Sequence, residues 1–166
     1  AALLGGLDLD QKPLVGALCR DAVQHDAAVG QAAPHEGRDL DRKGVYPPVA
    51  VLPSLSRLMD NGTGEGYTHK DHPNLAHQLF AAYARSTRVR VLASVMGMEG
   101  LSDTDKRYLK FGDTFEDELV SQAGPRTLEE SMDIGWRLLR VLPEAELSRL
   151  SDAQIDRYIR EEAEGA

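Results

Sequence analysis

Apolar residues recur every three or four positions along the second half of the chain, and this spacing predicts a series of amphipathic helices. The predicted apolar faces are Leu75, Leu79, Ala82 and Tyr83; Val89, Leu92, Val95 and Met96; Tyr108, Phe111, Phe115 and Leu119; Leu128, Met132, Trp136 and Leu139; and Ile155, Tyr158 and Ile159. The connections between them are short, which favours antiparallel packing of neighbouring helices in a bundle. We therefore predict a mainly α fold.

Residues that cap a helix N-terminus precede three of these faces. The capping pairs, each three positions apart, are Ser102 with Asp105, Thr127 with Glu130 and Ser151 with Gln154. Glycine and proline end the predicted helices, at positions 97, 100, 124, 125 and 143. The helices after residue 70 are thus predicted from their ends as well as from their faces.

Residues 45–59 read V-Y-P-P-V-A-V-L-P-S-L-S-R-L-M and separate this helical part from the start of the chain. β-branched and aromatic residues favour an extended chain here, whereas Pro47 and Pro48 exclude a central strand position. A short helical stripe after Pro53 is formed by Leu55, Leu58 and Met59. Arg57 falls among these apolar side chains, and a cation in that place needs an explanation.

Residues 1–39 lack a sustained apolar period, so we predict a loosely ordered segment with a short helix over 13–23. The spacing of His25 and His35 from Cys19 is not that of a metal site. The charged residues 38–44 end on Gly44, which is typical of a helix stop.

Composition limits the classes of partner. The chain has 166 residues and a net charge of −8, which argues against broad nucleic-acid binding through phosphates. No run approaches the roughly 18 apolar residues of a membrane span, and no basic region precedes an apolar start as in a secretory signal. Because the sequence does not begin with Met, we expect a fragment.

Candidate chemistry is sparse. We predict that the Gly-rich residues 60–66 form a plain connection, because they lack the Gly-Lys-Ser/Thr of a phosphate-binding loop. His69, His72 and His77 are predicted on a solvated face, with a metal site as the alternative. We place a further group of acidic residues on an exposed flank without a catalytic partner: Asp113, Glu116, Asp117 and Glu118.

Residues 40–158 resemble the B subunit of V-type and A-type rotary ATPases, the non-catalytic nucleotide-binding-type subunit of the soluble head. The matching motifs are D-R-K-G-V-Y-P-P-V-A-V-L-P-S-L-S-R-L-M, N-G-T-G-E-G-Y-T with D-H-P-N-L-A-H-Q-L, L-S-D-T-D-K-R-Y-L-K-F-G-D-T-F-E, T-L-E-E-S-M-D-I-G-W and L-P-E-A-E-L-S-R-L. The combination is specific, whereas no single motif would suffice.

The resemblance implies a C-terminal helical bundle domain over residues 67–166. Before it, residues 40–66 correspond to a remnant, a strand and a turn, of the family's α/β nucleotide-binding domain. Residues 1–39 are unmatched, and the family's N-terminal β-barrel and most of its α/β core have no counterpart in the sequence. A shifted reading frame upstream and a true variant both remain open as explanations.

The resemblance also gives Arg57 a role. In that family the Arg of L-P-S-L-S-R-L reaches the nucleotide on the neighbouring catalytic A subunit, so Arg57 is expected to act as an arginine finger in trans. It would contact the phosphates of ATP or ADP at the A–B interface only. Arg suits this task because its guanidinium is permanently charged and can donate two hydrogen bonds to phosphate oxygens. From the residues alone, capping or salt-bridging of a short helix is the other interpretation.

The implied function is that of a regulatory B subunit fragment in a V/A-type proton- or sodium-transporting ATPase or ATP synthase. Its expected partners are the catalytic A subunit in an alternating A–B hexamer and the central stalk subunits. We expect it to be cytoplasmic and peripheral to the membrane through the rotary complex, with no complete active site and no metal of its own. The alternative is a free-standing helical interaction module with no role in ATP hydrolysis.

Overall fold

The computed structural model describes residues 34–53 and 59–160. Its elements are α2 (Pro34–Arg42), η2 (Met59–Gly62), α3 (His72–Met96), η3 (Met98–Gly100), α4 (Asp103–Thr114), η4 (Phe115–Val120), α5 (Leu128–Leu139), η5 (Glu144–Glu146), α6 (Asp152–Ile155) and η6 (Asp156–Arg160). η4 and η6 are π-helical turns, and η2, η3 and η5 are 3-10 turns. The mainly α prediction is confirmed.

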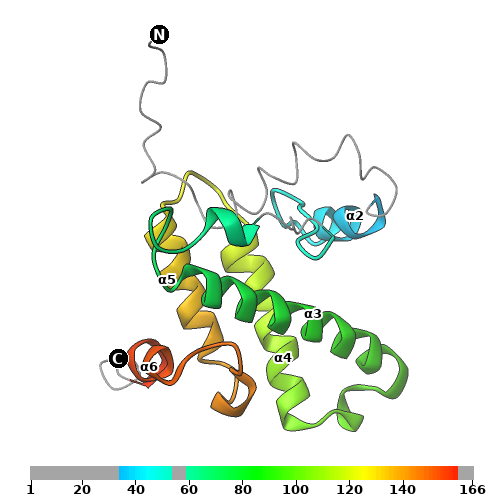
Figure 1. The fold of residues 1–166 in the computed structure, drawn as a ribbon. Helices are drawn as coiled ribbons and strands as arrows, with labels where there is room; N and C mark the ends of the chain where they lie inside the picture. Colours follow the sequence, from blue (N-terminus) through cyan, green and yellow to red (C-terminus); the bar gives the residue numbers. More distant parts are fainter. Residues whose placement is uncertain (1–33, 54–58, 161–166) are drawn as a thin grey trace.

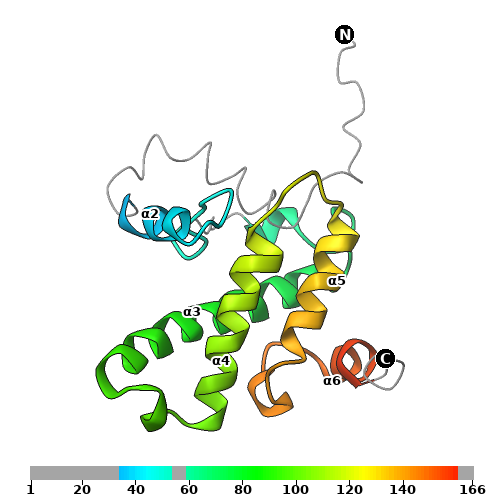
Figure 2. The ribbon, with the colours of Figure 1, turned by 180° about the vertical axis from the view of Figure 1, so that it is seen from behind.

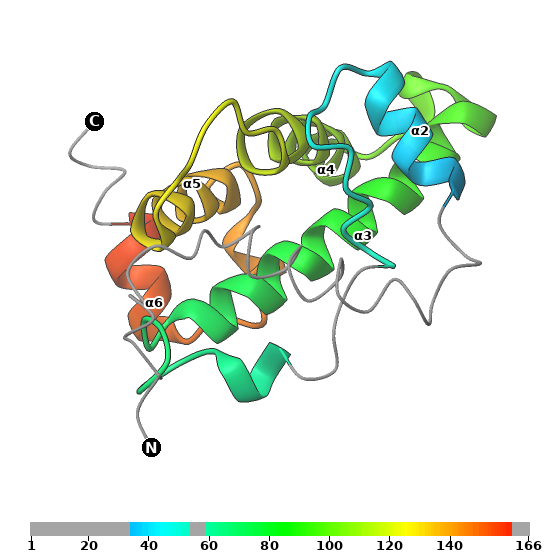
Figure 3. The ribbon, with the colours of Figure 1, turned by 90° about the horizontal axis from the view of Figure 1, so that it is seen from above.

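Three long helices form the centre of the molecule. α4 and α5 run antiparallel beside each other, and α3 crosses both of them (Figures 1 and 2). From above, α3 lies along one side of the α4–α5 pair, while α6 lies near the end of α5 (Figure 3). Among the described elements, α3 packs mainly against α4 and next against α5. This arrangement is the expected bundle.

The core lies between these helices and contains the predicted apolar faces. Fully buried side chains include Leu75 of α3, Phe111 of α4 and Leu139 of α5. Close packing of the backbones depends on small residues: a Cβ on Gly112 would lie 2.5 Å from Ser86 Oγ. The described helices therefore interlock tightly where α3 meets α4.

Helix capping follows the predicted pairs. Thr127 with Glu130 and Ser151 with Gln154 both form complete capping boxes. Ser102 Oγ accepts the backbone N–H of Asp105 and donates to its carboxylate at 2.6 Å, so only the forward half of the box is present there. A helix predicted as far as Gly124 ends at Val120, because the chain widens into the π turn η4 and then leaves the helix.

The start of the described chain differs in part from the prediction. α2 begins at Pro34, inside the segment expected to be loosely ordered, and ends just before Gly44, whose φ of +78° suits the predicted stop. Residues 45–50 form neither helix nor strand, and the described residues contain no strand that pairs with them. The stretch is held to the bundle by Gln122 N–H, which donates to Tyr46 O at 2.8 Å.

The last turns of α3 correct another prediction. Val89 is buried, but Leu92, Val95 and Met96 are exposed, as are Val91 and Met98 nearby. Val95 has 84% of its surface exposed. These turns and η3 extend beyond α5 and α6, so no other part of the described chain covers them (Figures 1 and 2). We call Val91, Leu92, Val95, Met96 and Met98 the α3 tip.

Candidate functional site

The residue expected to carry the chemistry, Arg57, lies outside the described residues. So do the predicted helix after Pro53, the helix over 13–23, Cys19 and His25, and the side chain of His35. The chain on each side of residues 54–58 is anchored in the bundle. Val51 is buried in the core before them. After them, Gly64 N–H donates to Thr68 Oγ1 at 2.8 Å, and the same oxygen lies 3.0 Å from Nδ1 of His72 in α3.

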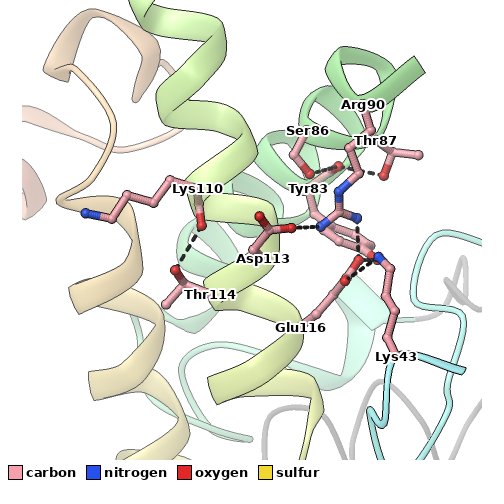
Figure 4. Close-up of polar contacts among 9 residues, drawn as sticks. All are labelled: Lys43, Tyr83, Ser86, Thr87, Arg90, Lys110, Asp113, Thr114 and Glu116. Carbon is pink, nitrogen blue, oxygen red and sulfur yellow. Dashed lines mark hydrogen bonds and ion pairs between the residues drawn. The ribbon is translucent and has the colours of Figure 1, made fainter. Parts of the chain in front are cut away.

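A charged cluster ties the chain that precedes Arg57 to the helical bundle (Figure 4). Its five members come from three parts of the chain: Lys43 after α2, Tyr83 and Arg90 on α3, and Asp113 and Glu116 on α4 and η4. We call them the Glu116 cluster. Because the members lie far apart in sequence, the cluster can form only when α2, α3 and η4 are packed together.

Glu116 is at the centre of the cluster and is only 3% exposed. Its Oε2 accepts from Lys43 Nζ at 2.9 Å, and its Oε1 accepts from Tyr83 Oη at 2.9 Å and from an Arg90 guanidinium N–H. The second Arg90 nitrogen donates to Asp113 Oδ1 at 2.7 Å. The buried carboxylate thus has a partner on both oxygens, which a buried charge requires.

The electrostatics of the cluster fix its charges. Burial acts to raise the pKa of Glu116, but the hydrogen bonds from Arg90, Lys43 and Tyr83 outweigh it and the pKa lies below its ordinary value. Burial, together with the charge of Glu116, raises the pKa of Tyr83. At neutral pH, Glu116 is therefore ionised and Tyr83 protonated. The arrangement suits a structural tie and not proton transfer.

A cavity of about 160 Å³ adjoins the cluster between α3 and the chain after α2. Its other lining residues are Asp39, Leu40, Thr87 and the stretch of Ala50, Val51 and Leu52. Pockets for small molecules and cofactors occupy roughly 300–1,000 Å³. This space is thus too small for a nucleotide, and it lies where the chain leading to Arg57 packs on the bundle.

Glu116 corrects the prediction of an exposed acidic flank. Asp113 and Asp117 are exposed, as expected, and half-buried Glu118 pairs with Arg137 at 2.6 Å near the surface. Glu116 lies in the π turn η4 next to buried Phe115, and Lys43, Tyr83 and Arg90 enclose its carboxylate. A strict 3.6-residue period does not reveal such a turn. The one feature of the sequence that indicates a buried acidic partner is Arg90, a cation between two valines on α3.

One of the three histidines predicted on a solvated face is placed differently, whereas His69 is exposed as predicted. His72 is 2% exposed, not solvated, and its Nδ1 lies 3.0 Å from Thr68 Oγ1. Burial, with a contribution from the charge of His69, lowers the pKa of His72 to about 4. In the part of the chain that the structure describes, no three His, Cys, Asp or Glu side chains are grouped so as to hold a metal ion.

A second polar group joins α6 and η6 to the start of α3. Asp71 accepts from Gln154 Nε2 at 2.7 Å and from Tyr158 Oη at 2.8 Å. Burial acts to raise the pKa of Asp71, yet the two hydrogen bonds help to bring it below its ordinary value. Trp136 stacks on Tyr158 with ring centroids 4.2 Å apart. These contacts close the bundle at the end opposite the α3 tip.

Known proteins identify the family of this bundle. Residues 61–159 match the family model described as the C-terminal domain of V and A type ATP synthase. The chain belongs to this family. The resemblance stated from the motifs is thereby confirmed, and the bundle of α3 to η6 corresponds to this ATP synthase domain.

Individual relatives agree with the family. The chain is 53% identical over 123 residues to the B subunit of the A-type ATP synthase of Methanopyrus kandleri, a match that covers 73% of this chain and 12% of that protein. It is 50% identical over 125 residues to the V-type ATP synthase beta chain of Halothermothrix orenii, covering 74% of this chain and 27% of that protein. The chain thus spans between an eighth and about a quarter of the length of these relatives.

A solved structure supports the same assignment. The chain is similar to the ATP synthase subunit NeqB from Nanoarcheaum equitans, with a TM-score of 0.56 and 38% sequence identity. The similarity covers 61% of this chain and 25% of that one. None of the described helices is long and apolar enough to cross a lipid bilayer.

Proposed function

We propose that this chain acts as part of the B subunit of a V/A-type rotary ATPase or ATP synthase that moves protons or sodium ions. In this proposal it packs against the catalytic A subunit of an alternating A–B hexamer and contacts the central stalk. It lies in the cytoplasm, peripheral to the membrane through the complex. ATP or ADP is bound only at the A–B interface, and this chain holds no metal.

The observation that carries the proposal is the extent of the match to two ATP synthase subunits. A continuous match over 73% of a 166-residue chain must include its middle, so residue 57 lies within the region that is 53% identical to the Methanopyrus protein. Arg57 therefore lies within the matched region. We propose that its guanidinium reaches the phosphates of the nucleotide on the A subunit.

The Glu116 cluster supports this role through geometry. A finger supplied in trans works only when its backbone is held in place, since a misplacement of about 1 Å can cost on the order of a hundredfold in rate. Lys43 and Val51 attach the chain before Arg57 to the bundle. When the A–B interface closes, the helical domain and the arginine finger would then move together.

The α3 tip supports membership of an assembly. Large apolar side chains that gather on a surface mark interaction sites, and five of them lie together near the end of α3. A partner that covers the tip would bury Val95 and Met96. A contact of this kind fits a subunit of a larger complex.

Association with the catalytic subunit tests the proposal. The complete A–B assembly should co-purify when its B subunit contains these residues, and Val95→Asp with Met96→Asp should weaken assembly with the central stalk. The matched control is Asp103→Asn with Glu99→Gln, which changes exposed charges near the tip without adding polar groups to it. Absence of any association with an A subunit would favour the alternative, a free-standing interaction module.

A further inference from the structure

A second surface on α3 lies apart from the Glu116 cluster, and Arg88 at its end is one helical turn before Leu92 of the α3 tip. A groove of about 540 Å³ runs between α3 and the chain that follows η5. Its floor is formed by half-buried Phe80, Ala81 and Ala84, and its edges carry His77, Arg85, Arg88 and Arg149. We call it the arginine groove. It is large enough for side chains of another molecule, in contrast to the cavity beside Glu116.

The groove is held in shape by a buried amide. Gln78 is 2% exposed, and its Nε2 donates to Glu146 O at 3.1 Å. Its Oε1 accepts from the backbone N–H of Arg149 at 3.0 Å. Both ends of one side chain thus fix the chain after η5 against α3, and this places Arg149 among the residues that line the groove.

The cations of the groove differ in their partners. Arg85 pairs with Glu146 at 2.6 Å and lies over the ring of Tyr108, so its charge is largely satisfied. Arg88 and Arg149 are exposed, and neither has an ion-pair partner among the residues that the structure describes. Two unpaired arginines thus border one apolar floor in a chain whose net charge is −8. The groove thus has an excess of positive charge, whereas the whole chain has an excess of negative charge.

We propose that the arginine groove is a docking site for an acidic amphipathic helix of a neighbouring protein. Glu or Asp side chains of that helix would pair with Arg88 and Arg149, and its small apolar side chains would rest on Ala81 and Ala84. Charge complementarity favours an acidic partner, because an arginine guanidinium binds a carboxylate through two parallel hydrogen bonds.

The spacing on α3 favours a helix over an extended segment. His77, Ala81, Ala84 and Arg88 follow one another at four, three and four positions, which is the spacing of a helix–helix seam. The two alanines permit close approach of a second helix axis. The stretch is about 17 Å long, which corresponds to three turns of a partner. This inference does not depend on Arg57 or on the rotary complex.

A binding experiment with the full chain tests the proposal. The probe is a fluorescein-labelled peptide of about 18 residues, long enough to be helical, with Ala and Leu at heptad spacing and Glu on both flanks. The control peptide has Gln in place of every Glu. Fluorescence anisotropy should show saturable binding of the Glu peptide that weakens with added salt, and amide NMR signals of Ala81 and Ala84 should shift.

Charge reversal locates the site. Arg88→Glu with Arg149→Glu should weaken binding by about tenfold or more. Arg107→Glu is the matched control, because Arg107 is an exposed arginine of α4 that also has no ion pair among the described residues. Unfolding curves of the wild type, the double variant and the Arg107→Glu control establish that all three are folded. These positions are exposed, so folding should be unaffected.

The opposite results overturn the proposal. Equal affinity of the double variant and the wild type would place binding elsewhere, and equal affinity for the Gln peptide would remove the role of charge. No saturable binding by the wild type would mean that the groove is not a docking site. Displacement of the peptide by inorganic phosphate at the peptide's own concentration would assign the groove to a small anion instead.

Discussion

Lys43 and Glu116 are 73 positions apart in sequence, and their side chains form an ion pair of 2.9 Å in the fold. The lysine follows α2, directly before the stretch that leads to Arg57, and the glutamate is buried in η4. This contact therefore joins the part of the chain with the proposed chemistry to the part that gives the fold its stability.

Removing the charge of Glu116 should destabilise the chain. Glu116→Gln leaves Arg90 half-buried without its main partner, and loss of one member of a buried charged network costs about 3–5 kcal/mol. Chemical denaturation measures the change in the free energy of unfolding. Glu118→Gln is the control, because it breaks only the surface pair with Arg137 and should cost less than about 1 kcal/mol. Similar losses for the two variants would contradict the central position of Glu116.

The bond from Lys43 should hold the chain after α2 in place. Lys43→Met removes this bond but retains much of the length of the side chain, so the overall free energy of unfolding should fall by only about 1 kcal/mol. Amide hydrogen exchange of Val45, which donates to Leu40 O at 3.0 Å, should accelerate more than exchange in α5. Uniform acceleration in both places would show that Lys43 has no local role.

Gly112 should not tolerate a larger side chain. Its Cβ in Gly112→Ala would lie 2.5 Å from Ser86 Oγ and 2.8 Å from Ser86 Cβ, so α3 and α4 must move apart. We expect a loss of about 1–3 kcal/mol. Gly124→Ala, which meets nothing within 4 Å, is the control. Ser86→Gly should restore part of the loss in Gly112→Ala, and a failure to do so would place the strain elsewhere.

His72 should make stability fall as the pH is lowered from 6.5 to 4. Its pKa is about 4 in the fold and 6.5 as the ordinary value, so between these limits the unfolded chain binds the extra proton. The difference of about 2.5 pKa units corresponds to on the order of 3 kcal/mol. Glu116 and Asp71, whose pKa values are lowered, add losses only below their ordinary values.

Urea denaturation at a series of pH values measures this effect. His72→Gln should flatten the curve between pH 6.5 and 4. An unchanged slope in His72→Gln would show that another group binds the proton.

The sequence predicted the bundle because its faces and caps are local signals. Thr127 with Glu130 and Ser151 with Gln154 form the boxes that their spacing indicates. The same reasoning failed where position in the whole fold decides burial. Val95 has the apolar character of a core residue, but nothing in the described chain reaches it, whereas Glu116 is buried because three distant groups meet it.

The candidate site could be predicted only in part. The motif around Arg57 was found by resemblance, but the Glu116 cluster depends on contacts between residues far apart in sequence. His72 shows the same limit, since it is 2% exposed although its residue type and local pattern indicate a solvated face. Local periodicity does not contain such information.

The central claim is that Arg57 completes the ATP site of a neighbouring subunit, and ATP turnover by a complete A–B complex tests it most directly. Arg57→Ala should leave assembly intact and lower turnover on the order of a thousandfold, the scale of an arginine finger. Arg107→Ala, at an exposed arginine of the helical domain, should keep wild-type turnover. Turnover of the assembled Arg57→Ala complex equal to that of the wild type would contradict the claim.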